Sequence, residues 1–275
     1  MKDDRLTTAV QGHYAAVARG EACACGAPAD EAAKSLGYSD EELALAGDAN
    51  LGLGCGNPLA LAQIAPGMTV VDLGSGAGFD ALLAWRRVGP AGRVIGVDMT
   101  ADMLLLARNN AKKRDAANVE FRQGFIEDLP IDSGVADYVV SNCVINLSVN
   151  KPAVFREIAR VLKPGGRFAV SDIVLLKSLP AELAHEISAY VGCIAGASLL
   201  TDYLRMALAA GLHELSIPTI AHGPDLVKVL APTSSTSASG SCCGSVVSLP
   251  SLENADRVLR ETAAAVASIK LHGRK

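Results

Sequence analysis

Three single cysteines stand in unusual settings along this 275-residue chain. Cys143 directly follows the apolar stretch "VVSN", so it comes where a buried strand is expected to end. Cys55 lies between glycines in "GLGCGNP", and Cys193 lies among small residues in "YVGCIAGA". A lone free thiol is most often a small core hydrophobe. Three thiols brought to one crevice would instead form a soft pocket, which selects thiophilic ligands.

A glycine-rich turn forms a second group of residues whose spacing could serve ligand binding. "VVDLGSGAGFD" has the pattern D-x-G-x-G-x-G, which begins at Asp72 and has its glycines within residues 74–78. Phe79 stands where a dinucleotide fingerprint needs glycine. Asp98 lies 22 residues beyond Gly76 and suits the two hydroxyls of a ribose, which donate to an anionic acceptor. These features predict a nucleoside cofactor.

The elements that position these residues alternate between strand and helix. Strands are predicted at 68–74, 92–98, 118–124, 136–142 and 167–174, with helical spacing between them. This alternation predicts a doubly wound, mostly parallel, Rossmann-like α/β sheet. The alternating polarity of 118–124 is typical of a strand near an edge. Ligands of such a sheet bind beyond the carboxyl ends of its strands.

The chain divides into three predicted regions. Residues 1–57 form a helical N-terminal cap with a cysteine-bearing loop, and 58–175 form the cofactor-binding domain. Residues 176–275 form a smaller α+β, substrate-binding region. In it we expect helices up to about 212, a strand at 213–220, a Ser/Gly-rich loop at 231–245 and a final amphipathic helix at about 253–269.

Composition excludes several classes of protein. The net charge is −4, and Lys and Arg form no dense stripe, so a nucleic-acid partner is not expected. Neither a membrane span nor the apolar core of a secretory signal is found, which predicts a cytoplasmic protein without a membrane partner. Seven cysteines occur without any C-x-x-C, so the usual spacing of a structural zinc site is missing.

Residues 66–175 resemble the class I methyltransferases, which bind S-adenosylmethionine (SAM). This resemblance implies that SAM is bound by Asp72, Gly74, Ser75, Gly76, Gly78, Asp98, Met99, Ile126, Glu127 and Asn142. Methyltransferases of amide or ring nitrogens often carry N-P-P-Y or D-P-P-Y where this chain has "SNCV". The difference counts against DNA and protein amides as substrates.

The acceptor is indicated by the thiols. None of the five histidines lies at a strand end, where a general base would be expected. Trivalent arsenic bonds to sulfur and keeps a lone pair that attacks the methyl group directly, so it needs no base. The stretches "LGCGNP", "VIGVDMT", "SNCVINLS" and "GCIAGA" resemble the SAM-dependent arsenite methyltransferases, which serve arsenic detoxification.

That resemblance implies roles for the cysteines. Cys143 and Cys193 hold the arsenic and Cys55 is a third ligand. An N-terminal cysteine, Cys23 in preference to Cys25, forms a disulfide with Cys55 that returns the pentavalent product to the trivalent state. The resemblance also implies arsenite and methylarsenite as substrates and a thiol reductant such as glutathione or thioredoxin. A monomer is expected.

Other interpretations stay open at this point. The chain could methylate a small organic acceptor with thiols that only pack, or it could bind arsenite without catalysis. A zinc-thiolate enzyme is a third alternative, which the ligand spacing disfavours. The adjacent Cys242 and Cys243 would capture arsenite first, as a separate hypothesis. The number of methyl groups added is not indicated.

Overall fold

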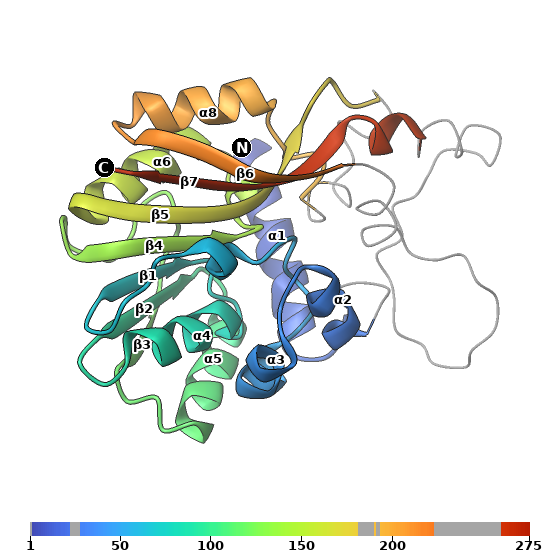
Figure 1. Cartoon of the computed structure of the whole chain (residues 1–275). Helices are drawn as coiled ribbons and strands as arrows, with labels where there is room; N and C mark the ends of the chain where they lie inside the picture. The colour runs from blue at the N-terminus through green and yellow to red at the C-terminus, as the bar shows by residue number, and fades with distance from the viewer. Residues whose placement is uncertain (1, 23–27, 181–189, 191–192, 223–259) are drawn as a thin grey trace.

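A seven-stranded sheet forms the centre of the molecule in the computed structural model (Figure 1), which describes residues 2–22, 28–180, 190, 193–222 and 260–275. The strand order is β3-β2-β1-β4-β5-β7-β6. The strands are β1 (Thr69–Leu73), β2 (Arg93–Asp98), β3 (Val119–Gln123), β4 (Ala136–Asn142), β5 (Leu162–Leu175), β6 (His213–His222) and β7 (Val266–Arg274). The first five are parallel, and β7 runs antiparallel to both of its neighbours. The predicted doubly wound, mostly parallel sheet is confirmed.

Two helical layers bury the two faces of this sheet. Helices α4 (Phe79–Val88) and α5 (Ala101–Lys113) pack on β1, β2 and β3, and α6 (Lys151–Val161) and α8 (Leu200–Ala209) pack on β5. Neighbouring residues of β1 serve opposite faces, since Val70 packs with the α4 layer and Val71 with the α6 layer. This alternation is the period of two that a strand imposes on its side chains.

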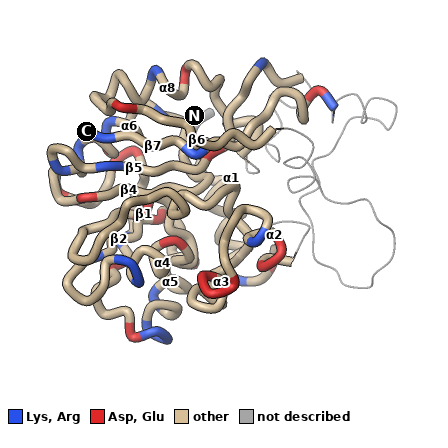
Figure 2. The backbone as a smooth tube through the Cα atoms, viewed as in Figure 1, with Lys and Arg blue, Asp and Glu red and all other residues tan. Residues whose placement is uncertain are grey.

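The N-terminal segment is helical, as expected. It contains α1 (Lys2–Ala18), α2 (Ala29–Ser35) and α3 (Asp40–Ala46), and α1 packs against α5. Ser39 and Glu42 form a capping box that fixes the start of α3. Figure 2 shows acidic residues on α2 and α3, where the first turns of both helices carry them. Short 3-10 turns follow at η1 (Gly47–Ala49), η2 (Pro58–Leu61) and η3 (Ile145–Leu147).

The prediction of a last helix at 253–269 is wrong over its final residues. Residues 266–274 form β7, which lies between β5 and β6. Val266, Ala267, Ile269 and Leu271 are buried there on both faces of the sheet, so their pairing partners override the helical spacing. The strand expected at 213–220 is β6, and the edge position of β3 is confirmed.

Several expectations lie outside the described residues. These are the helix expected across 181–189 and 191–192, the Ser/Gly-rich stretch 231–245, and the start of the last helix at 253–259. The division between 58–175 and 176–275 stays a prediction, although β6 and β7 complete the same sheet as β1–β5.

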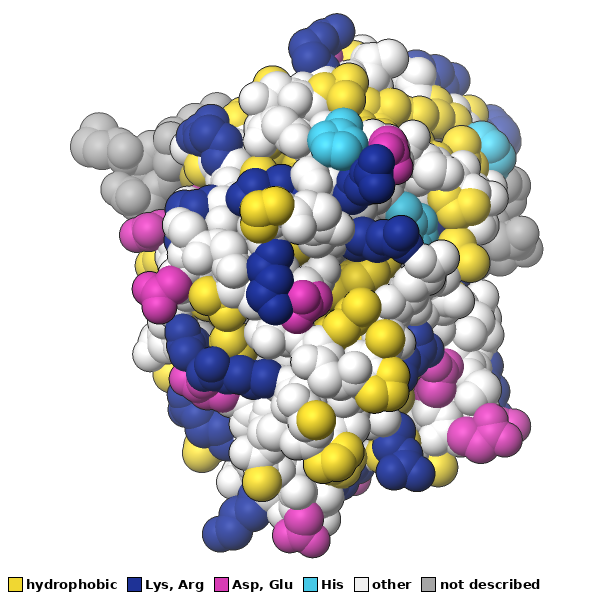
Figure 3. Space-filling view, turned by 60° about the vertical axis from the view of Figure 1, so that its left-hand side comes forward, with side chains coloured by type: hydrophobic (Ala, Val, Ile, Leu, Met, Phe, Trp, Pro, Cys, Tyr) yellow, Lys and Arg dark blue, Asp and Glu magenta, His cyan; other side chains and the backbone are white. Residues whose placement is uncertain are grey.

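Surface charge is dispersed on the face drawn in Figure 3, where Lys and Arg side chains are separated by hydrophobic and acidic ones. Among the helices that the structure describes, none combines the length and the apolar character needed to cross a membrane.

Candidate active site

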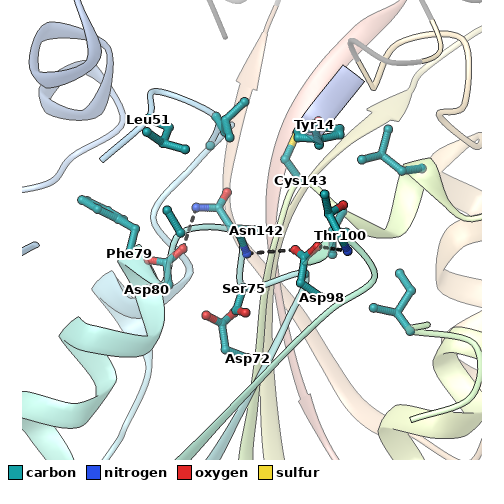
Figure 4. Close-up of a pocket in the computed structure, with 18 of the residues that line it drawn as sticks. Tyr14, Leu51, Asp72, Ser75, Phe79, Asp80, Asp98, Thr100, Asn142 and Cys143 are labelled. Carbon is teal, nitrogen blue, oxygen red and sulfur yellow. Dashed lines mark hydrogen bonds between the residues drawn. The ribbon is translucent and has the colours of Figure 1, made fainter. Parts of the chain in front are cut away.

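A cavity lies at the carboxyl ends of β1, β2 and β4 (Figure 4). Residues of α1, α2 and the 49–54 loop also line it, so the N-terminal segment covers this end of the sheet. The predicted cofactor residues that line it are Asp72, Gly74, Ser75, Gly76, Asp98, Met99, Ile126, Glu127 and Asn142. Gly78 does not line the cavity but precedes α4, with a φ of 90°. The strand ends therefore bring almost all of these residues together.

The turn after β1 depends on glycine at position 74. Gly74 has a φ of 64°, in the left-handed region that side chains disfavour. A Cβ there would also lie 2.7 Å from the Cβ of Val144, in the loop after β4. Only glycine therefore lets the two strand ends approach closely.

Three carboxylates gather at the floor of the cavity. Burial raises the pKa of Asp72 well above its usual range, and the charges of Asp80 and Asp98 raise it further. One carboxylate oxygen of Asp72 is buried and has no hydrogen-bond partner in the described part of the chain. Burial also raises the pKa of Asp80 to about 6. A positively charged ligand would relieve this concentration of negative charge.

Asp98 is held in a fixed orientation at the end of β2. Its two oxygens accept hydrogen bonds from the backbone N–H of Gly76 at 2.9 Å and of Thr100 at 2.8 Å (Figure 4). Burial raises its pKa, and these two donors oppose the rise. A carboxylate has about four lone-pair positions, so Asp98 can still accept from the hydroxyls of a sugar.

Asn142 links the cavity to the loop that carries Cys55. Its amide nitrogen donates to Asp80 at 2.9 Å (Figure 4), to the carbonyl of Gly56 at 2.9 Å and to the Tyr38 hydroxyl at 3.0 Å. Its oxygen accepts from the backbone N–H of Cys55 at 3.2 Å. The Tyr38 hydroxyl donates to Asp80 at 2.8 Å. We call Tyr38, Asp80 and Asn142 the Asn142 network.

The glycines beside Cys55 explain why its loop lies so close to the sheet. A Cβ on Gly54 would approach the Asn142 amide to 2.9 Å, and one on Gly56 would approach Ser171 to 2.8 Å. On the sheet side, the hydroxyl of Ser268 donates to the carbonyl of Cys55 at 2.8 Å. The loop is thus held between the Asn142 network and strands β5 and β7.

The three predicted arsenic-binding cysteines form one buried cluster with neighbouring apolar residues. Cys143 lies between the other two and interacts through its thiol with Cys55 and with Cys193. The Cys193 thiol also donates to the carbonyl of Cys143 at 3.0 Å. Cys143 lines the cavity, so this thiol cluster adjoins the space beside the glycine turn.

Two of these cysteines have strained backbones. Cys143 has a φ of 58° and Cys193 a φ of 63°, both in the left-handed region that non-glycine residues rarely adopt. At Cys143 the conformation is held by its N–H, which donates to the carbonyl of Ser171 at 2.8 Å. Such strain is typical of functional positions, and here it directs side chains from separate segments to one point.

The thiols of the cluster are protonated when they have no ligand. Burial raises the pKa of Cys55 to about 11. The interaction with Cys193 lowers the pKa of Cys143, but Cys55 and burial outweigh it, so that pKa lies well above the usual range. The interaction with Cys143 and burial also raise the pKa of Cys193. A ligand that replaces these protons by covalent bonds to sulfur avoids forming buried anions.

A carboxylate that the sequence analysis did not select completes the cluster. Asp172 of β5 is fully buried, and one of its oxygens lies within 4.8 Å of the sulfurs of both Cys55 and Cys143, which are as close to each other. It accepts hydrogen bonds from the Tyr203 hydroxyl at 2.9 Å and from the Asn146 amide at 2.8 Å. Burial raises its pKa to about 7.

Comparisons with known proteins identify the family. A family model described as a methyltransferase domain matches residues 64–214, more than half of the chain. The chain is 50% identical over 183 residues to the arsenite methyltransferase of Halobacterium salinarum, a match that covers 66% of this chain and 47% of that protein. The solved arsenic(III) S-adenosylmethionine methyltransferase of Chlamydomonas reinhardtii is 30% identical, with a TM-score of 0.63, over 90% of this chain and 75% of that one. The chain belongs to the SAM-dependent arsenite methyltransferase family.

Two further relatives are less similar in sequence. The human arsenite methyltransferase is 34% identical over 168 residues, which is 58% of this chain and 44% of that protein. The chain spans about half the length of the curated relatives it matches. A solved geranyl diphosphate methyltransferase is 21% identical at a TM-score of 0.59 over 79% of this chain and 74% of that one, and it shares the fold.

The cavity of this family member fits SAM by its own groups. The unpartnered oxygen of Asp72 and the neighbouring Asp80 face a space where a positive charge is favoured, and SAM carries an ammonium and a sulfonium. Asp98 offers acceptors for the ribose. The absence of a side chain at Gly74 and Gly76 leaves room along the turn.

Some predicted residues cannot be placed, and some placed residues were not predicted. Cys23, Cys25, Cys242 and Cys243 lie outside the described residues, so their roles stay predictions. Tyr38, Asp80 and Asp172 were missed. Asp80 reads as an ordinary acidic residue in the first turn of a helix. Asp172 gave a clearer signal, because it interrupts the apolar run "RFAVSDIV" of a strand expected to be buried.

Proposed function

We propose that the protein transfers the methyl group of SAM to trivalent arsenic bound by Cys143, Cys193 and Cys55, as part of arsenic detoxification. The observation that carries this proposal is the convergence of three thiols, from segments up to 138 positions apart, beside a cavity that fits SAM. A methyltransferase of small organic acceptors would have no use for such a cluster.

The first step is the exchange of arsenic–oxygen bonds for arsenic–sulfur bonds. Each thiol replaces one hydroxyl of arsenite, an As–S bond forms, an As–O bond breaks, and the thiol proton leaves with the hydroxyl as water. The product with three thiols is uncharged. The high pKa values of Cys55, Cys143 and Cys193 favour this outcome, because the buried sulfurs never have to persist as free thiolates.

The second step is the methyl transfer. When bound, SAM supplies a methyl group on a positively charged sulfur. Cys143 reaches from the end of β4 into the cavity wall and holds arsenic with its lone pair toward that space. The As–CH₃ bond forms as the S–CH₃ bond breaks, and the electron pair of that bond stays with the leaving sulfide. The Asn142 network keeps Cys55 in place beside Cys143 during the transfer.

The transfer leaves arsenic oxidised by two electrons. A pair of thiols returns them by forming a disulfide, which we assign to Cys55 with Cys23 or Cys25. A thiol reductant such as glutathione or thioredoxin then restores the dithiol. A monomeric, cytoplasmic enzyme acting on arsenite and methylarsenite is the corresponding expectation for the whole protein.

The test measures SAM consumption and arsenic speciation with arsenite and glutathione, for the parent and for Cys143→Ser. We expect methylated arsenic from the parent and at least a hundredfold less from the variant, since one sulfur ligand is lost next to the cavity. SAM binding, measured by calorimetry, serves as the folding control and should be retained. Equal methylation by both proteins would refute the role of Cys143. SAM binding by both without any methylated arsenic would return the small organic acceptor as the function.

A further inference from the structure

The thiol cluster contains a group that trivalent arsenic does not need. The coordination of As(III) is complete with three sulfurs. The carboxylate of Asp172 nevertheless lies within 4.8 Å of the sulfurs of Cys55 and Cys143. A fully buried carboxylate is costly unless it is paired or binds a cation. Its position among thiols therefore calls for a ligand that uses both kinds of donor.

We propose that Cys55, Cys143 and Asp172 form a binding site for a thiophilic divalent cation such as Zn²⁺, which competes with trivalent arsenic for the two sulfurs. Zinc takes thiolate and carboxylate ligands together, at about 2.3 Å for sulfur and about 2.0 Å for oxygen. In a tetrahedral site these lengths place donor atoms about 3.5 to 3.8 Å apart. Donors already within 4.8 Å of one another need to close by only about 1 Å.

The carboxylate is oriented as metal-binding carboxylates are. The Tyr203 hydroxyl donates to one of its oxygens at 2.9 Å, and the Asn146 amide and the N–H of Ile173 donate to the other at 2.8 and 2.9 Å. These bonds use three of about four lone-pair positions and leave one for a cation. Outer donors of this kind fix a ligand and contribute to metal affinity.

Charge balance also favours a cation at this point. Two thiolates and a carboxylate carry three negative charges against the two positive charges of Zn²⁺. Burial lowers the pKa of Lys151, at the start of α6, but the charges of Asp172 and Cys193 oppose this effect, and an ammonium there would offset the remaining negative charge. The protons that leave the thiols pass to the solvent. The fourth position of a tetrahedral site is then open to water, as in zinc sites with three protein ligands.

The cation site stands on ligand geometry alone, whereas its competition with arsenite rests on the proposed function. The experiment therefore measures Zn²⁺ first. The reduced full-length chain, without SAM or arsenite, is titrated with Zn²⁺ against a chromophoric chelator. Co²⁺ is used in parallel, because its spectrum reports tetrahedral geometry and sulfur ligation. We expect one equivalent bound, with a sulfur-to-cobalt charge-transfer band.

The variants separate the carboxylate from the thiols. Asp172→Asn should weaken Zn²⁺ binding at least tenfold, and Tyr203→Phe, a milder change, should weaken it roughly tenfold through the lost outer donor. Glu157→Gln is the control and should keep the Zn²⁺ affinity, because Glu157 is a mostly buried carboxylate of α6 whose partners are Arg160 and the backbone N–H of Leu129. Equal Zn²⁺ affinities in the parent, Asp172→Asn and Tyr203→Phe would overturn the site.

Competition is measured last. Arsenite should displace one equivalent of Zn²⁺, and Zn²⁺ should raise the apparent KM for arsenite without changing that for SAM. Zn²⁺ bound through Asp172 but not displaced by arsenite would overturn the shared site. A chain that binds Zn²⁺ but never methylates arsenic would refute the proposed function and leave the cation site intact.

Discussion

The Asn142 network offers a sharp test of how the cofactor cavity positions a thiol. Tyr38→Phe removes one hydroxyl and nothing else. That hydroxyl donates to Asp80 at 2.8 Å and accepts from Asn142 at 3.0 Å. The ring of Tyr38 is buried and packs edge-on against Phe79 with centroids 4.8 Å apart, a contact that Phe preserves. The change is therefore confined to the hydrogen bonds.

Its size follows from the partners. A buried hydrogen bond to a charged group contributes about 1.5 to 3 kcal/mol to folding. For a chain of this size, about 1 kcal/mol corresponds to about 2 to 4 °C in Tm, so the variant should melt about 3 to 12 °C lower. Because Asn142 holds the backbone of Cys55, a displaced Cys55 should also lower the arsenite affinity. Each ~1.4 kcal/mol of arsenite binding free energy lost in this way lowers the affinity about tenfold.

The assay pairs thermal unfolding with arsenite binding measured by calorimetry. Tyr138→Phe is the matched control, since Tyr138 is also buried but does not line the cavity. The control should keep its arsenite affinity, whatever its Tm. If Tyr38→Phe also kept its arsenite affinity while its Tm fell, the network would support the fold without positioning Cys55. That result would refute the reasoning.

Three further outcomes are expected. Gly74→Ala should abolish SAM binding in calorimetry, because the new Cβ meets Val144 and the φ of 64° disfavours alanine; unchanged affinity would contradict the tight turn. Asp98→Asn should weaken SAM binding about 10- to 100-fold, since a charged acceptor for the ribose is lost. The affinity of the cysteines for arsenite should not change; equal losses of affinity for both ligands would indicate unfolding instead. The pKa of Asp80 is raised to about 6 in the folded chain from 3.8, so its contribution to stability is lost as the pH rises through this interval. The Tm of the parent relative to Asp80→Asn should therefore decrease from pH 4 to pH 6 and change little above, and a constant difference would contradict it.

The sequence predicted those parts of the fold that local patterns determine. Strand–helix alternation with glycine stops located β1 to β5, because each strand has its own apolar run and its own turn. The failure at 266–269 has a physical cause. From residue 267 on the strand alternates, with Ala267, Ile269 and Leu271 in the core and Ser268, Lys270 and His272 on the other face. This period of two is short, and the prediction extended the helical spacing of the preceding residues across it.

The candidate site divides in the same way. Asp72, Gly74 and Asp98 were predictable because strand ends of a parallel sheet meet at one edge, so position along the chain implies position in space. Tyr38 was not, since its role depends on the packing of the N-terminal segment over the cavity. The three cysteines were selected one by one for their unusual sequence settings. The contact that holds Cys55 beside Cys143, the hydrogen bond from the Cys55 N–H to the Asn142 side chain, is seen only in the fold.

Asn142 and Cys143 are neighbours in sequence, and this adjacency explains the organisation of the site. The side chain of Asn142 points to the cavity and holds the Cys55 backbone, while the left-handed turn at the next residue directs the Cys143 thiol into the cluster. One peptide unit thus sets both the distance between two thiols and their distance from the cavity. A displacement of the β4 end would change both distances at once, so methyl transfer and arsenic binding should be lost together when this unit is altered. Asn142→Ala should therefore weaken arsenite binding although the cysteines remain, and an unchanged arsenite affinity would show that Cys55 reaches the cluster without it.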